Sequence, residues 1–97
     1  MRIIFRNRGL EECYNSQSAA IREWGPDVAR SYRIRLSLID SLTRWEDIAS
    51  FRSARAHRLH GDRAGQWSIY LVGRWRLILE PKPDIVFILE VSNHYGD

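Results

Sequence analysis

Apolar residues recur with two different periods along this 97-residue chain, and the change of period separates a helical half from a strand half. Met1–Phe5 is a short run of β-branched and aromatic residues, which predicts a strand. From Leu10 to Trp24 the apolar residues recur every three or four positions. This spacing predicts an amphipathic helix that begins after Asn7, with Asn15-Ser16 as a candidate break.

Gly25-Pro26-Asp27 predicts a boundary between two helices. Glycine suits the end of one helix, proline suits the first position of the next, and an aspartate stabilises the positive end of a helix dipole. The second helix is expected from about Asp27 to Leu42, with a broad apolar face, Ile34 included, that should lie on a sheet. Thr43-Arg44-Trp45-Glu46 has the pattern of a capping box, which predicts a short further turn through Ile48.

After Ser53 the apolar period becomes two, which predicts strands. The predicted strands are Ile69–Val72, a strand that follows the turn at Gly73, and Ile85–Ser92 after the turn at 81–84, with a possible short extra strand near His57. The order β-α-α-β-β-β indicates a single α+β domain over residues 1–97. Two N-terminal helices should pack on one face of a small antiparallel or mixed sheet, and the other face should be partly open.

Alternation along the strand after Gly73 assigns its side chains to the two faces of the sheet. Trp75, Leu77 and Leu79 should face the core, and Arg74, Arg76 and Ile78 should share the opposite face.

The positive charge of the chain is concentrated in one segment. The net charge is +3, and residues 52–76 contain six arginines against one aspartate. Such a concentration is typical of proteins that bind a polyanion, although a solvated arginine-rich surface would have the same composition. The single cysteine excludes an internal disulfide and a Cys-pair zinc site, and it fits a reducing compartment. With no apolar run near 20 residues and no signal-peptide pattern at the start, the sequence predicts a cytoplasmic protein without a membrane span.

Arginines, histidines and a tyrosine on one side of a small sheet could bind and cleave a phosphodiester. Cleavage of RNA without a metal uses the 2′-hydroxyl as nucleophile, so the protein must remove one proton, supply another and stabilise charge on the phosphate. Histidine suits both proton roles, and the guanidinium fork of arginine suits the phosphate. Arg76 is the strongest candidate, with an ion pair to Glu80 or Glu90 as the structural alternative. The other catalytic candidates are His57, His94 and Tyr95.

Further basic residues are candidates for holding the RNA backbone without taking part in the chemistry. They are Arg58, His60, Arg63, Arg74 and Lys82. Trp67 is expected in the core, because stacking on a base would require it to face the open side.

The densest group of these residues resembles the HigB-type killer toxins of the RelE/ParE superfamily of type II toxin–antitoxin systems. The resemblance rests on His57-x-Leu59-x-Gly61-Asp62-Arg63-x-Gly65-Gln66-Trp67-Ser68, on Gly73-x-Trp75-Arg76-Leu77 and on a terminal His/Tyr strand. It implies a ribosome-dependent mRNA endonuclease that needs no metal or cofactor and is inhibited by a helix-turn-helix antitoxin encoded beside it. Operator DNA would be bound only through that antitoxin.

The resemblance also implies residue roles. His57 matches the family's histidine before Gly-Asp, Arg76 matches its phosphate-contacting arginine, and His60 stands where the family usually has a lysine. The family often ends Asp-Tyr-His, whereas this chain has Asn93-His94-Tyr95, so the carboxylate is absent and the histidine and tyrosine are exchanged.

Two other functions fit the same sequence. One is a ParE-like inhibitor of DNA gyrase, which binds without catalysis. The other is a non-catalytic protein that binds its antitoxin and operator DNA in a repressor complex.

Overall fold

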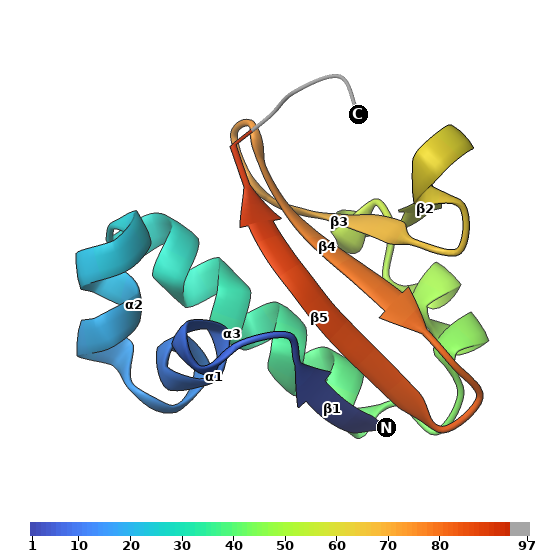
Figure 1. The fold of residues 1–97 in the computed structure, drawn as a ribbon, viewed down its shortest axis with the longest axis horizontal. Helices are drawn as coiled ribbons and strands as arrows, with labels where there is room; N and C mark the ends of the chain where they lie inside the picture. The colour runs from blue at the N-terminus through green and yellow to red at the C-terminus, as the bar shows by residue number, and fades with distance from the viewer. Residues whose placement is uncertain (94–97) are drawn as a thin grey trace.

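The computed structural model describes residues 1–93 as a five-stranded sheet with three α-helices on one face (Figure 1). The α-helices are α1 (Arg8–Asn15), α2 (Gln17–Trp24) and α3 (Pro26–Ser41). The strands are β1 (Arg2–Phe5), β2 (His57–Arg58), β3 (Trp67–Val72), β4 (Trp75–Pro81) and β5 (Ile85–Ser92). Three short 3₁₀ turns, η1 (Trp45–Ser50), η2 (Arg52–Ala54) and η3 (Gly61–Arg63), lie between α3 and β3. The predicted α+β class and the predicted last strand are confirmed.

The first helical segment is divided where the sequence indicated a break. Asn7 caps α1, because its Oδ1 accepts a hydrogen bond from the Leu10 backbone N at 2.9 Å. Ser16 then has extended backbone, and its Oγ accepts from the Ala19 backbone N at 3.2 Å, so the residue that ends α1 also caps α2. The predicted cap and break are both confirmed.

The helix α3 carries most of the helical side of the core. Tyr32, Leu36 and Ile39 are fully buried against the sheet, where Leu77 and Leu79 of β4 are also fully buried. Its apolar face is narrower than the sequence predicted. Ile34 is 55% exposed. It lies two positions from both Tyr32 and Leu36, and in a helix that spacing directs its side chain away from the face that packs on the sheet.

The predicted turn after α3 is present, but its predicted cap is wrong. The turn η1 is a 3₁₀ helix whose N-cap is Arg44, and no side chain bonds to the cap. The Asp47 backbone N donates to Arg44 O at 3.1 Å, so the turn starts one residue after Thr43. A capping box with Thr43 as the cap therefore cannot form.

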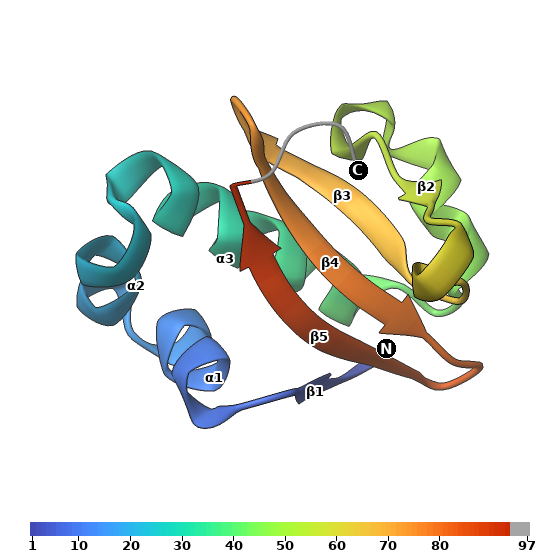
Figure 2. The same ribbon diagram turned by 45° about the horizontal axis from the view of Figure 1, so that its top comes forward.

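The sheet is mixed, with strand order β1-β5-β4-β3-β2. β1 pairs in parallel with β5, whereas all the other neighbours are antiparallel. Figure 2 shows β1 at one edge and the two-residue β2 at the other. The chain between β1 and β5 contains all three helices, which allows the two strands to run in the same direction.

A β-bulge in β5 determines which of its last side chains face the core. Ile78 pairs with Glu90 and Leu79 pairs with Ile88, so Leu89 is the additional residue. Up to Ile88 the even-numbered residues face the core, and after the bulge the parity is reversed. Glu90 therefore faces away from the helices. Without the bulge, strict alternation would have directed its carboxylate into the core.

Candidate nucleic-acid interface on the outer face

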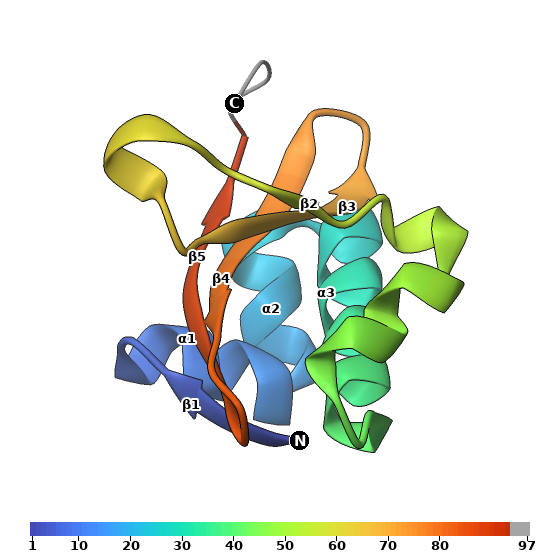
Figure 3. The same ribbon diagram turned by 90° about the vertical axis from the view of Figure 1, so that its right-hand side faces the viewer.

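The sheet face opposite the helices, which we call the outer face, carries the residues that the sequence singled out. Figure 3 shows the helices on one side of the sheet and the η3 turn on the other. Register places two rows of side chains across this face. The first row is His57, Ser68, Ile78 and Glu90, and the second contains Tyr70, Arg76 and Ser92.

Arg76 lies in the second row, near the hairpin between β3 and β4. Its guanidinium Nη1 donates to Gly73 O and to Trp75 O, both at 3.0 Å, and its Cζ lies 5.0 Å from the centre of the Tyr70 ring. The predicted orientation of Arg76 away from the helices is confirmed. Of the acids proposed as its structural partners, Glu90 pairs with Arg63 and Glu80 pairs with Lys82.

Arg55 and Tyr70 join this group, although the sequence did not single them out. The Arg55 Cζ lies 4.7 Å from the centre of the Tyr70 ring, so two guanidinium groups approach one aromatic ring. Continuation of the β2–β3 register places Arg55 across from Tyr70, in the row that contains Arg76. The signal in the sequence was only its presence in the arginine-rich segment, because Arg55 and Tyr70 are brought together by tertiary structure.

His57 lies on the outer face at the edge strand β2, with an exposed side chain. Its Nδ1 is 3.2 Å from Arg55 O. A carbonyl oxygen only accepts hydrogen bonds, so this contact requires the proton on Nδ1 and leaves the lone pair of the neutral ring on Nε2. From strand spacing alone, the Cα atoms of His57 and Arg76 lie roughly 12 Å apart, two strands across and two residues along. The two residues therefore lie on the same face of the sheet, on strands that are two apart.

The turn η3 covers part of the outer face. His60 is its exposed N-cap residue, and Arg63 Nη2 lies 3.4 Å from Glu90 Oε2. On the same side of the sheet as η3, Ile78 is fully buried and Leu59 is nearly fully buried. Neither residue belongs to the main core between the sheet and the helices. The outer face is therefore only partly open, with the η3 turn over one end.

Arg58, Trp67 and Lys82 are not close to Arg76. Arg58 follows His57 in the strand and therefore points to the other side of the sheet, with its Cζ 5.6 Å from the centre of the Trp67 ring. Trp67 packs edge-to-face on the buried Trp45 at 5.4 Å, which confirms its predicted place on the core side. Lys82 lies in the turn after β4, at the opposite end of that strand from Arg76, and its Nζ is 2.9 Å from Glu80 Oε2.

Three predicted site positions differ from this arrangement or lie outside it. Arg74 is exposed in the turn between β3 and β4, so it precedes β4 and does not share a strand face with Arg76. The terminal candidates His94 and Tyr95 lie outside the described residues.

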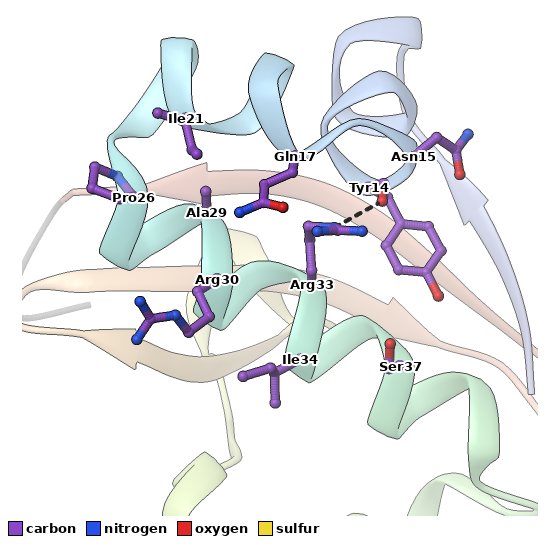
Figure 4. Close-up of a pocket in the computed structure, with 10 residues that line it drawn as sticks. All are labelled: Tyr14, Asn15, Gln17, Ile21, Pro26, Ala29, Arg30, Arg33, Ile34 and Ser37. Atoms are coloured by element: carbon purple, nitrogen blue, oxygen red, sulfur yellow. Dashed lines mark hydrogen bonds between the residues drawn. The ribbon is translucent and has the colours of Figure 1, made fainter.

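Two hollows are formed by residues among 1–93, and neither is lined by His57 or Arg76. The larger, about 760 Å³, lies between η1 and the ends of β3 and β4, where it is lined by Arg58 and Lys82. The other, about 610 Å³, lies on the helical side, and Figure 4 shows it between α2 and α3 with Arg33 bonded to Tyr14 O at 3.3 Å. The candidate interface is therefore an open sheet face, a shape that suits an extended chain better than a small molecule.

Among residues 1–93, no group of histidine, cysteine and acidic side chains has the arrangement of a metal site. Within the same range, no helix is long and apolar enough to cross a membrane.

The overall architecture is that of the RelE-like toxins. The structure is similar to the YoeB/ParE toxin from Agrobacterium tumefaciens, with a TM-score of 0.57 and 14% identity over 98% of this chain and 100% of the other. It is also similar to the YoeB dimer from Staphylococcus aureus, with a TM-score of 0.61 and 14% identity over 98% of both chains. No protein-family model and no curated protein matches the sequence. At this identity the similarity establishes the fold, and function has to be argued from the outer face.

Proposed function

We propose that the chain is the toxin of a type II toxin–antitoxin pair, of the HigB type, and that it cleaves ribosome-bound mRNA without a metal ion. The observation that carries this proposal is the presence of His57 and Arg76 on one open sheet face of a RelE-like fold. A face with arginine donors and a histidine base suits a phosphodiester substrate.

In the proposed reaction, the ribose 2′-oxygen attacks the adjacent phosphorus and the bond to the 5′-oxygen breaks. His57 Nε2, which carries the lone pair in the observed contact, accepts the proton of the 2′-hydroxyl. Arg76 donates hydrogen bonds to the phosphate oxygens as negative charge develops on them. His94 or Tyr95 supplies the proton to the departing 5′-oxygen. The products are a 2′,3′-cyclic phosphate and a 5′-hydroxyl.

Other basic residues would hold the RNA backbone. His60, Arg63 and Arg74 are placed around the outer face and the hairpin next to it. Arg58 and Lys82 line the larger hollow, so a role for them requires RNA that continues around the edge of the sheet.

The deciding experiment is cleavage of mRNA on purified ribosomes by the wild type and by Arg76→Ala and His57→Ala. Loss of a positioned charge stabiliser lowers the rate by about 10²–10³, and loss of a general base by about 10²–10⁴. His57→Ala should impair cleavage more than ribosome binding. Undiminished cleavage by Arg76→Ala would remove the proposed site. Loss of wild-type cleavage in EDTA, on ribosomes shown to stay intact, would remove the metal-free mechanism.

A ParE-like inhibitor of DNA gyrase is the second candidate, and the name of the Agrobacterium neighbour, YoeB/ParE, supports it. Inhibition of gyrase supercoiling without any mRNA cleavage would favour this function. A protein that is inactive in both assays but binds a neighbouring antitoxin and its operator would be the non-catalytic repressor component.

The proposed partner is a helix-turn-helix antitoxin encoded by an adjacent gene. Acidic groups on the antitoxin would match the basic outer face. Co-expression should restore growth and allow the two proteins to be purified together. A chain that is harmless when induced alone and is not bound by the product of either neighbouring gene would contradict the toxin proposal.

A further inference from the structure

We propose that Arg55 is a second phosphate-binding residue of the outer face, and that Tyr70 positions Arg55 and Arg76 to bind the RNA backbone together. This inference rests on the proposed function and adds to it a residue that no sequence motif assigns to the site.

The first observation is the shared aromatic ring. The guanidinium carbons of Arg55 and Arg76 lie 4.7 and 5.0 Å from the centre of the Tyr70 ring. Two guanidinium groups beside one ring bring two forks of hydrogen-bond donors to one place on the outer face. None of the three ion pairs recorded among residues 1–93 includes Arg55.

The second observation is the backbone of Arg55. Its φ is +46°, and it is the only non-glycine residue with positive φ within residues 1–93. The left-handed region is unfavourable for a residue with a Cβ, and such conformations are common at functional sites, where the surrounding structure imposes them.

The third observation is the set of hydrogen bonds that positions Tyr70 relative to Arg76 and to the segment before Arg55. From α3, Arg35 Nε donates to Tyr70 O at 3.1 Å and Arg35 Nη2 donates to Ser53 O at 2.7 Å. One side chain thus fixes the backbone of Tyr70 relative to the segment just before Arg55. The Tyr70 hydroxyl accepts from Gly73 N at 3.0 Å, and Gly73 O accepts from Arg76. The ring is therefore held at the hairpin next to both arginines.

The ligand that fits this arrangement is a single-stranded RNA backbone. Each guanidinium presents a planar fork of donors that matches phosphate oxygens, and a face without an enclosed pocket accommodates an extended chain. Tyr70 contributes no charge, so its role is to position the two arginines.

The test is binding of a short single-stranded RNA with 2′-O-methyl groups, which lacks the nucleophile and cannot be cleaved, over a range of salt concentrations. Arg55→Gln should weaken binding about tenfold. The slope of log affinity against log salt should become shallower by about 0.7, as expected for one lost phosphate contact on a single strand. Arg55→Lys should keep the slope while binding more weakly, because it keeps the charge and loses the fork.

Tyr70 is tested by two variants with unchanged charge. Tyr70→Phe keeps the ring and loses only the hydroxyl that accepts from Gly73 N, so it should weaken RNA binding less than Tyr70→Leu does. Tyr70→Leu removes the ring and should weaken binding several-fold, with its folded state checked by circular dichroism. Wild-type binding by a folded Tyr70→Leu protein would overturn the positioning role.

The matched control is Arg30→Gln, which removes the same charge from the exposed surface of α3 on the helical side. Equal affinities and equal slopes for Arg55→Gln and Arg30→Gln would overturn the role of Arg55, as would a wild type that binds no RNA at low salt. Cleavage on ribosomes is scored separately. If the wild type cleaves mRNA but Arg55→Gln binds RNA normally, the role of Arg55 is wrong and the proposed function is unaffected. If the wild type binds RNA through Arg55 but does not cleave it, only the endonuclease proposal is wrong.

Discussion

Arg63 and Glu90 connect the η3 turn to β5 across the outer face, with Arg63 Nη2 3.4 Å from Glu90 Oε2. The two residues are 27 positions apart in the sequence. Their ion pair lies in the part of the face where Ile78, which pairs with Glu90, is fully buried. The same contact places a carboxylate on a surface that is otherwise rich in arginine.

Replacement of Glu90 tests whether that carboxylate limits RNA binding. Both side chains of the pair are about two-fifths exposed, at 43% and 39%, so Glu90→Gln should change the free energy of unfolding by less than about 0.5 kcal/mol. Binding of single-stranded RNA should become several-fold tighter, because Arg63 is released and one negative charge is removed. Glu23→Gln on α2 is the control for net charge. Weaker binding by Glu90→Gln would show that the ion pair itself builds the RNA site.

Ser68 provides a test of the packing of the outer face. It is 1% exposed, and its Oγ has no hydrogen-bond partner among residues 1–93. A buried hydroxyl without a partner is unfavourable, so Ser68→Ala should raise the free energy of unfolding by about 1 kcal/mol in urea denaturation. Ser31→Ala is the matched control, because Ser31 Oγ donates to Leu71 O at 2.9 Å and its loss should cost about 1 kcal/mol. A lower stability for Ser68→Ala would mean that the hydroxyl has a partner in solution.

The positive φ of Arg55 predicts an unusual order of stability for two variants that both lack the long side chain. Arg55→Gly should be more stable than Arg55→Ala by about 1 kcal/mol, because glycine adopts the left-handed region without strain. At Arg52, inside η2, the order should be reversed, since glycine destabilises helical backbone. Thermal unfolding of the four variants measures both differences. The same order at the two positions would contradict the observed backbone of Arg55.

Cys13 should be unreactive in the folded protein. Burial raises the pKa of its thiol, and the nearby Glu23 carboxylate raises it further. At pH 8 less of the thiol is therefore ionised than in an ordinary cysteine, and thiolate is the reactive form. Modification by a thiol reagent should be at least about 100-fold slower in the native state than in denaturant, because it requires local opening of α1. Equal rates in the two states would show that α1 is not stably packed.

The sequence predicted those features of the fold that depend on local chemistry. Asn7 and Ser16 act where a short polar side chain can cap a helix, and Gly73 lies where a hairpin needs a tight turn. Alternation was sufficient to orient Arg76, because β4 is regular over the residues next to it. These signals are contained in a few neighbouring residues, so one sequence was enough.

The remaining features depend on contacts between distant segments. The meeting of Arg55 with Tyr70 requires η2 to lie beside β3, and no period in the sequence encodes that position. Alternation also predicts that Arg58 and His57 face opposite ways, yet shared positive charge had placed both in one candidate site. The wrong cap at Thr43 has a similar origin, because the spacing of a capping box does not show whether the turn is α or 3₁₀. Composition and spacing identify candidate groups, and tertiary structure determines which of them meet.

The extra residue in β5 has a consequence for protein engineering. Leu89 shifts the strand by one position. Alternation counted from the turn at Lys82 therefore gives the wrong face of the sheet for the residues after Leu89. Deletion of Leu89 would make β5 a regular strand in which Glu90 still faces outward and Val91 still faces the core, because Glu90 would then directly follow the core-facing Ile88. A library that varies only every second residue of β5 would mix core-facing with outward-facing positions, because the parity changes at Leu89. Designs on this strand should therefore treat the residues before and after Leu89 as two separate frames.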